Sequence, residues 1–453
     1  MMAARQKIHN LLCSDSRSSL ILKNVLASFF VKGWSAIVVL LMVPLTLKCL
    51  GVYKNGVWLT ISSLLVWIDQ MDIGLGNGMR NKLATYIAHE DYRNGASVVS
   101  STIAMLLCIV IVVFSILALL ITYTDVFSFL NVEPSSLPEL RVALFSAVIL
   151  VCVTFVLKVI GNLYMALQLP AVSNLIIAIG QTLALFLTWL LYVTDKASFL
   201  NVVVVNTAAP LLPYICAYFY TFYFKYPQLR PHISLINIRT AISLGNIGIS
   251  FFWIQAATLI QYMSANILIS KLFSPAMVTP YQIAYRYLSL IVVAFTVICM
   301  PYWSATTDAY ERGDIQWIQT SNKKLNFVIA LIAMALVLMT LLSPFVYSIW
   351  IGNKCDVPFG ITVMMATYIF LLIVSMRYSY ILNGLGALRM QLYMTFTAII
   401  FIPLAWFVSE LTHDIVCFMF VMCICVLPGT FTNMIQLNKI LKGKATGIWR
   451  IGA

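Results

Sequence analysis

Six charged residues of this sequence lie inside long apolar stretches, where a charge is costly and where binding or chemistry should be sought. Each such charge costs about 2.5–3.5 kcal/mol at the centre of a bilayer on insertion scales. The six residues are Lys32, Asp69, Asp72, Lys158, Arg286 and Arg377. Because four bases stand against two acids, the field inside the membrane is net positive. A positive, water-filled cavity favours an anionic group such as a pyrophosphate.

The four bases also have simpler interpretations. A long basic side chain near a helix end can extend to the lipid headgroups, and this alternative applies to Lys158, Arg286 and Arg377. Lys32 lies deeper, and its alternative is a structural pair with a carboxylate on the adjacent helix. The acids Asp69 and Asp72 are three residues apart and share one helix face. Aspartate is too short to extend far, so we expect that face to meet a cavity or a cation.

Polar uncharged side chains recur at helical spacing in the stretch 244–271. They are Gln255, Thr258, Tyr262 and Asn266, and Tyr285 follows early in the next apolar stretch. Amides and tyrosines that face a wet cavity suit sugar hydroxyls, which offer donors and acceptors without net charge. The alternative is that these groups bond neighbouring helices to each other.

The most distinctive run of the sequence is DIGLGNGMRNK at residues 72–82. Three glycines in five positions are expected to break the helix near the membrane interface and to let backbones approach closely. The basic end of the run could hold phosphate, with Asn77 and Arg80 as candidate ligands. It could also follow only from the rule that places basic residues on one side of the membrane, and this is the better interpretation of Lys82.

Membrane-spanning helices must position these residues. Of the 453 residues 62% are apolar and only 9% are charged, whereas globular proteins carry roughly 25% charged residues. The mean hydropathy is +0.95, so the chain could not cover its own surface in water. A span needs about 20 mostly apolar residues. The predicted spans are twelve: 25–47, 57–76, 98–122, 142–164, 173–193, 201–224, 244–271, 280–303, 325–349, 359–383, 392–408 and 415–436.

The basic residues predict the orientation of these spans. The net charge of +13 comes from clusters between apolar runs, which is the pattern of membrane topology rather than of nucleic-acid binding. If the N-terminus is cytoplasmic, eighteen of the 28 Lys and Arg residues lie on that side, six lie opposite and four lie within spans. We therefore predict that both termini are cytoplasmic.

Weak internal repeats indicate two halves. NVLASFF at residues 24–30 resembles NIGISFF at residues 246–252, and residues 51–58 resemble 273–281 at nearly the same offset. Six spans in each half give both halves the same orientation, with a pseudo-two-fold axis along the membrane normal. We predict a cytoplasmic leader at 1–24, an N-lobe at 25–224, a cytoplasmic linker at 225–243, a C-lobe at 244–436 and a cytoplasmic tail at 437–453.

The run at 72–82 resembles the helix-2 signature of O-antigen and capsule repeat-unit flippases. This polysaccharide transporter family belongs to the multidrug/oligosaccharidyl-lipid/polysaccharide exporter superfamily. The opening Tyr281-x-x-Ala284-Tyr285-Arg286 resembles the start of helix 8 in the same family. The resemblance covers essentially the whole chain, with twelve helices, two six-helix lobes and cytoplasmic termini. The cavity charges of such flippases vary between members, so the carry-over of single residues rests mainly on these two matches.

The resemblance implies a bacterial inner-membrane protein of lipopolysaccharide or capsule biosynthesis. Two lobes would alternate access to a cationic cavity and flip an oligosaccharide on undecaprenyl pyrophosphate outward. Lys32 and Arg286, with Arg377, would hold phosphate or acidic sugar. Asp72 and Asp69 would hold a coupling cation, a proton or sodium, with no other cofactor. The implied partners are the lipid-linked glycan, membrane lipid, a polysaccharide polymerase and a chain-length regulator, but not nucleic acid, and the protein would act as a monomer.

Three other classes of membrane protein remain as alternatives. A cation-coupled drug antiporter on the same fold would have an apolar or acidic cavity, and a peptidoglycan-precursor flippase would carry additional helices. A membrane scaffold without transport is the simplest alternative. The four histidines lie outside the spans, and the ten cysteines, including Cys423 and Cys425, show no metal or disulfide spacing. With no nucleophile–base pair in view, we predict that the protein is not an enzyme.

Overall fold

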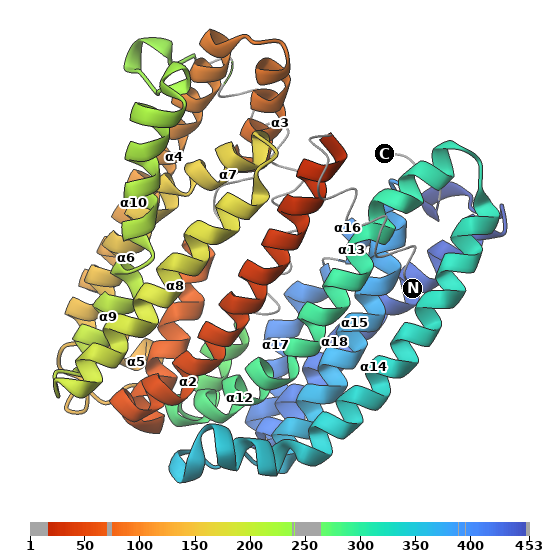
Figure 1. The fold of residues 1–453 in the computed structure, drawn as a ribbon. Helices are drawn as coiled ribbons and strands as arrows, with labels where there is room; N and C mark the ends of the chain where they lie inside the picture. The colour runs from red at the N-terminus through yellow and green to blue at the C-terminus, as the bar shows by residue number, and fades with distance from the viewer. Residues whose placement is uncertain are drawn as a thin grey trace. The chain divides into compact units, whose positions relative to one another are not determined.

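The computed structural model of the chain describes residues 17–69, 75–237, 240, 264–387, 389–394 and 396–449, with the side chains of some helical residues, Asp69 and Asn77 among them, outside this description (Figure 1). All regular secondary structure in these ranges is helical, as predicted. The chain divides into two compact units. Unit 1 comprises residues 1–50, 64–128 and 133–252, and unit 2 comprises 51–63, 129–132 and 253–453.

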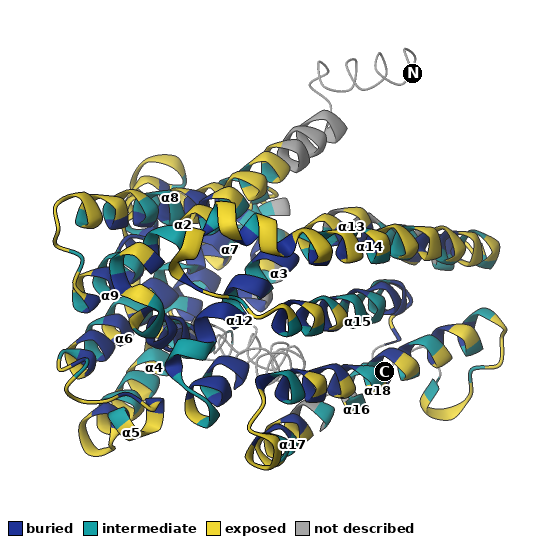
Figure 2. Cartoon of the chain, turned by 90° about the horizontal axis from the view of Figure 1, so that it is seen from below, coloured by how far each residue is buried: buried dark blue, intermediate teal, exposed yellow. Residues whose placement is uncertain are grey.

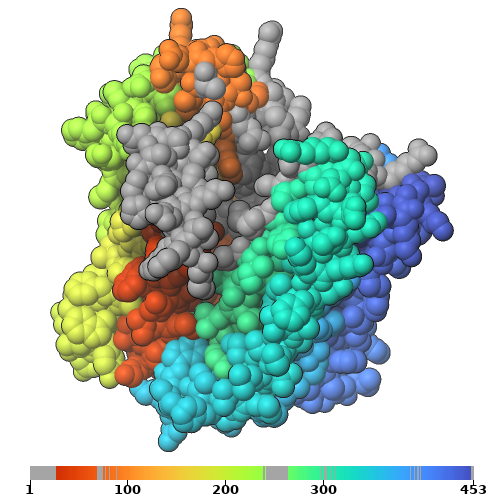
Figure 3. Space-filling model, turned by 45° about the vertical axis from the view of Figure 1, so that its right-hand side comes forward, coloured from red at the N-terminus to blue at the C-terminus, as the bar shows by residue number. Residues whose placement is uncertain are grey.

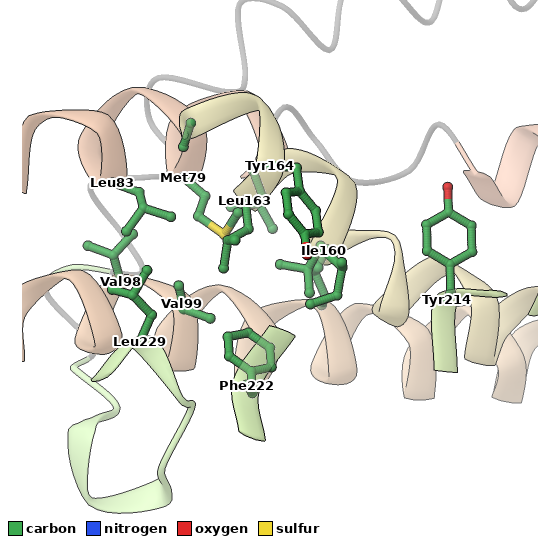
Figure 4. Close-up of a cluster of buried hydrophobic side chains, with 14 of the residues drawn as sticks. Met79, Leu83, Val98, Val99, Ile160, Leu163, Tyr164, Tyr214, Phe222 and Leu229 are labelled. Carbon is green, nitrogen blue, oxygen red and sulfur yellow. The ribbon is translucent and has the colours of Figure 1, made fainter. Parts of the chain in front are cut away.

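Unit 1 is a helical bundle whose elements run in chain order from α2 to η3. Its helices are α2 (Arg17–Asp69, shared with unit 2), α3 (Leu75–Ala88), α4 (Tyr92–Tyr123), α5 (Val126–Leu130, also shared with unit 2), α6 (Leu140–Leu157), α7 (Val159–Ala166), α8 (Pro170–Val193), α9 (Phe199–Ala208) and α10 (Leu211–Phe219). The π-helix η1 (Tyr220–Lys225) and the short 3₁₀ turns η2 (Pro227–Leu229) and η3 (Ile233–Leu235) follow. A buried apolar cluster joins α3, α4, α7 and η1 (Figure 4). Met79, Leu83, Val99, Leu163 and Phe222 lie in this cluster.

Unit 2 begins, among the described residues beyond position 252, with a helix at 264–272. Its other helices are α12 (Pro275–Leu288), α13 (Leu290–Glu311), α14 (Ile315–Trp350), α15 (Phe359–Gly384), α16 (Arg389–Met394), α17 (Phe396–Thr412) and α18 (Ile415–Leu441), with the 3₁₀ turns η4 (Gly352–Lys354) and η5 (Gly447–Trp449). Helix α15 packs against α12, α13, α14 and α18. It is therefore the central helix of this unit, and it carries Arg377.

The outer faces of the helices are apolar. On α14 the side chains of Phe327, Met334, Leu341 and Phe345 are each about two-thirds exposed, and Figures 2 and 3 show α14 along the surface. Such faces would aggregate in water but suit a lipid environment. Within the described ranges, eight helices are long and apolar enough to cross a membrane. The chain is a polytopic membrane protein.

Several predicted boundaries are wrong, for identifiable local reasons. The predicted spans 25–47 and 57–76 correspond to two helices within α2 that meet at a kink at Gly51 (φ 69°, ψ 177°), so the connection between them is shorter than predicted. Such a conformation is open mainly to glycine. Helix α2 ends at Asp69 and α3 begins at Leu75; of the three glycines in the predicted helix break, Gly74 lies outside the described residues, and Gly76 and Gly78 lie inside α3. Both glycines are buried there, so their small size serves packing.

Other predicted spans are divided. The span 142–164 consists of α6 and α7, which meet at Lys158. The spans 201–224 and 280–303 are likewise each made of two or more helices. The span 244–271 lies mostly outside the described residues, and the boundaries of the predicted leader, lobes, linker and tail stay predictions.

Candidate functional site

Arg377 is a buried charge of unit 2. Its side chain is 4% exposed, and it lies in α15, seven residues before the C-terminal end of that helix. One guanidinium nitrogen, Nη2, donates to both the backbone carbonyl and the side-chain oxygen of Asn322 on α14, at 3.0 and 2.6 Å. The guanidinium carbon lies 4.7 Å from the ring centroid of Tyr378. Arg377 therefore does not extend to the headgroups, which was the alternative interpretation of its position.

The contacts that the structure describes for Arg377 are all with neutral groups. Its Nε donor is buried and has no hydrogen-bond partner among the described residues. A buried cation that lacks a counter-charge is costly, because neutral hydrogen bonds replace only part of its hydration. Arginine cannot escape this cost by losing its proton. A site of this kind gains strongly from an anion.

Arg286 and Tyr285 lie at the C-terminal end of α12, and both are half-buried. Helix α12 begins with Pro275 at its first turn, after the cap of Ser274, whose side chain accepts a hydrogen bond from the Met277 amide. A cation in the last turn interacts favourably with the helix dipole. The position of Arg286 therefore has a structural reason besides any ligand.

Asn266, the third predicted residue of this region with a described side chain, is 4% exposed. Its side-chain oxygen accepts from Gln282 Nε2 at 2.7 Å, and its Nδ2 donates to the carbonyl of Leu59 at 3.4 Å. These bonds join the helix at 264–272, α12 and the part of α2 that belongs to unit 2. In this structure the amide holds helices together, and its role toward a sugar stays a prediction.

The predicted residues of unit 1 are less completely described. Lys32 is exposed on α2, with no hydrogen bond of its ammonium group found within the described ranges. Arg80 is exposed on α3, where Nη1 lies 3.9 Å from the sulfur of Met165. Asp69 is the last residue of α2 and Asn77 lies within α3. Three predicted residues lie outside the described residues, and their roles stay predictions. They are Asp72, Gln255 and Tyr262.

Asn322 is the residue that sequence reasoning missed. It stands directly before Lys323 and Lys324, outside the predicted span 325–349. Helix α14 in fact begins at Ile315, after the cap of Asp314, whose carboxylate accepts from the Trp317 amide at 2.9 Å. Asp314 was the sequence signal that this helix begins before residue 325, because aspartate often caps the N-terminus of a helix. Within the described ranges, no group of three or more His, Cys, Asp and Glu side chains could hold a metal ion.

Solved structures share this fold. One is described as an inward-facing conformation of a multidrug resistance MATE family transporter of the MOP superfamily, with TM-score 0.74, 14% identity, and coverage of 91% of this chain and 96% of that one. A MATE structure in a straight conformation gives TM-score 0.61 at 14% identity, covering 96% and 98%. An outward-facing MATE transporter of the MOP superfamily gives TM-score 0.52 at 12% identity, covering 92% and 97%.

These likenesses confirm the predicted fold class, an all-α polytopic membrane protein with the two-lobed fold of MATE transporters. No protein-family model matches the chain. No curated protein sequence matches it either. The likeness at this level of identity concerns the fold, so the substrate must be argued from the site.

Proposed function

We propose that this protein is a transporter of the MOP superfamily that moves an anionic, lipid-linked oligosaccharide across a membrane by alternating access. In its specific form, the substrate is an O-antigen or capsule repeat unit on undecaprenyl pyrophosphate. The membrane is the bacterial inner membrane, with both termini cytoplasmic. A proton or sodium gradient supplies the driving force, and Asp69 and Asp72 are the proposed coupling residues.

The observation that carries the proposal is the environment of Arg377. A cation that is 4% exposed, contacts only neutral groups in the described ranges and keeps one buried donor without a partner there favours an anionic ligand. A phosphate group would supply both the counter-charge and an acceptor for the guanidinium fork. Arg286, half-buried at the end of α12 in the same unit, adds a second positive charge.

The fold supports the transport half of the proposal. The structures that share it include MATE transporters in inward-facing and outward-facing conformations. Alternation between two such states around a fixed site is the general way in which secondary transporters work. The resemblance of residues 72–82 and of Tyr285 and Arg286 to flippases supports the lipid-linked substrate.

The second candidate function is drug antiport, which the description of the neighbouring structures as multidrug resistance transporters favours. A site for organic cations needs acidic or aromatic groups. The intramembrane charges described in unit 2, Arg377 and Arg286, are positive. They would therefore repel a cationic drug.

A transport assay with the purified full-length chain in vesicles separates the two functions. A short oligosaccharide on a fluorescent polyprenyl pyrophosphate and a cationic dye are offered in turn, with and without a proton or sodium gradient. The proposal expects gradient-dependent movement of the pyrophosphate lipid and none of the dye. Movement of the dye alone would establish the antiport function instead, and the proposal would be abandoned.

A further inference from the structure

A groove on unit 1 lies apart from the charged residues discussed so far. Its volume of about 570 Å³ is within the range of ligand sites, and it lies between α7, α8, α10 and η1. Helices α8 and α10 pack against each other and run in opposite directions (Figure 1). The groove lies along the first half of α8 and along α10.

Two apolar stripes form its walls. Val172, Ile176, Ile179 and Leu183 follow each other on α8 at intervals of three or four residues. On α10 and η1 the stripe contains Leu212, Cys216 and Tyr220 at intervals of four. Residues at these intervals share one helix face. Their side chains therefore line the groove continuously.

The groove faces outward from unit 1. Ile179, Leu212 and Tyr220 are each about half exposed, as expected of spans whose outer faces meet lipid. From Leu212 to Lys225 the chain rises roughly 20 Å at helical geometry. Half of a bilayer core is about 15 Å thick. The groove is thus long enough to hold one lipid chain across the hydrocarbon core of one leaflet.

A cation stands at one end of the groove. The ammonium of Lys225 lies 5.7 Å from the ring centroid of Tyr164 and 5.6 Å from that of Tyr226. Tyr164 is itself held by a hydrogen bond of 2.9 Å with the hydroxyl of Thr221. Lys225 is exposed, so the two rings position the ammonium without enclosing it.

The backbone at this end of the groove is irregular, and the irregular segment ends at Lys225. Residues Tyr220–Lys225 form a π-helix, and the amide of Tyr226 donates to the carbonyl of Thr221 at 2.7 Å. π-helical turns are rare and are frequent at functional sites. Exposed aromatic side chains surround Lys225 along the chain, as is usual at the level of the lipid headgroups. They are Phe219, Tyr220, Tyr223 and Phe224.

From these features we infer that the groove between α8 and α10 binds an anionic lipid, with its phosphate at Lys225 and one chain along the apolar stripes. Charge complementarity at Lys225 selects the headgroup, and the stripes hold the chain. The inference does not depend on what the protein transports, since any phosphate-bearing anionic lipid of that leaflet fits the description.

Photolabelling of the full-length protein in vesicles tests the inference. The vesicles contain phosphatidylcholine and a small fraction of either phosphatidylglycerol or phosphatidylcholine that carries a diazirine in one chain, and labelled residues are mapped by mass spectrometry. We expect phosphatidylglycerol to label residues of α8 and α10 in preference to phosphatidylcholine. Equal labelling of these helices by the two lipids would mean ordinary solvation by the bilayer and would overturn the inference.

Variants separate the headgroup from the chain. Lys225→Gln should lower labelling by phosphatidylglycerol roughly fivefold, as expected for the loss of one basic residue at an anionic surface. Arg230→Gln is the matched control, because Arg230 is an exposed base five residues further on and does not line the groove. Ala217→Phe should fill the groove and reduce labelling by both lipids. Unchanged labelling in Lys225→Gln, or an equal loss in Arg230→Gln, would contradict the assignment.

Discussion

Replacing Gly56 by alanine should disrupt the part of unit 2 where α2 meets the start of α12. A Cβ atom at Gly56 would overlap the carbonyl oxygen of Pro275 and would lie 2.7 Å from the carbonyl carbon, whereas real Cβ atoms are essentially never closer than 3.0 Å to a neighbour. Both partners are backbone atoms, so no side chain can rotate away. The two segments must separate.

The size of the effect follows from what the separation breaks. Asn55 donates to the hydroxyl of Thr279 at 3.3 Å, and that hydroxyl donates to the carbonyl of Val52 at 2.8 Å. Loss of two neutral hydrogen bonds costs about 1–3 kcal/mol, and overpacking adds about 1–3 kcal/mol. The higher helix propensity of alanine returns about 1 kcal/mol. The net loss of unfolding free energy is about 1–5 kcal/mol.

Thermal unfolding of the purified protein in detergent measures this loss. Gly33→Ala is the matched control, because Gly33 lies in the same helix and a Cβ atom there would meet no described neighbour within 4 Å. We expect the melting temperature to fall by about 1–5 °C in Gly56→Ala, and to stay or rise slightly in Gly33→Ala. Equal melting temperatures for the two variants would refute the close backbone contact.

Three further predictions concern charges. Arg286→Ala should abolish surface polysaccharide in cells while leaving the amount of protein unchanged, and wild-type polysaccharide in that strain would remove Arg286 from the site. Asp72→Asn should uncouple lipid translocation from the ion gradient in vesicles, and an unchanged ion dependence would argue against a coupling role. The side chain and backbone of Asn94 donate to the carboxylate of Asp91 at 2.6 and 3.1 Å, and these bonds lower the pKa of Asp91 below its ordinary value of 3.8. Since the folded-state pKa is the lower one, the cap on α4 is complete above pH 3.8 and is lost as the pH falls through the folded value. Amide exchange in the first turn of α4 should therefore accelerate in acid, and Asp91→Asn should lose this pH dependence.

Composition was sufficient to predict helices but not their interruptions. Uninterrupted apolar runs correctly indicated α4, α14, α15 and α18, because a bilayer leaves a long apolar segment few alternatives to a helix. The kink at Gly51 lies between two predicted spans, so this interruption was anticipated, although the connection is shorter than predicted. The division of one predicted span into α9, α10 and η1 was missed, because it leaves the apolar pattern intact. Pro210, between α9 and α10, was the visible signal.

The charged residues could be found from sequence, but their surroundings could not. A base inside an apolar run identified Arg377, yet its partner Asn322 is 55 residues away and on another helix. From sequence alone, Arg377, Arg286 and Lys32 are all candidates for the same anion site. The structure separates them, with Arg377 buried, Arg286 half-buried and Lys32 exposed. In the sequence, Lys225 is one of the eighteen basic residues counted on the cytoplasmic side, and its contacts with Tyr164 and Tyr226 become visible only in the structure.

Translocation of a polyprenyl-pyrophosphate oligosaccharide by Arg377→Gln is the most direct test of the account. Glutamine retains a donor for Asn322 but removes the buried charge, so the melting temperature should stay the same or rise. Arg389→Gln is the control, since Arg389 is an exposed base in the same unit. We predict that Arg377→Gln loses most of the translocation rate while Arg389→Gln keeps it. Wild-type translocation by a stably folded Arg377→Gln protein would contradict the claim that this buried cation serves an anionic substrate.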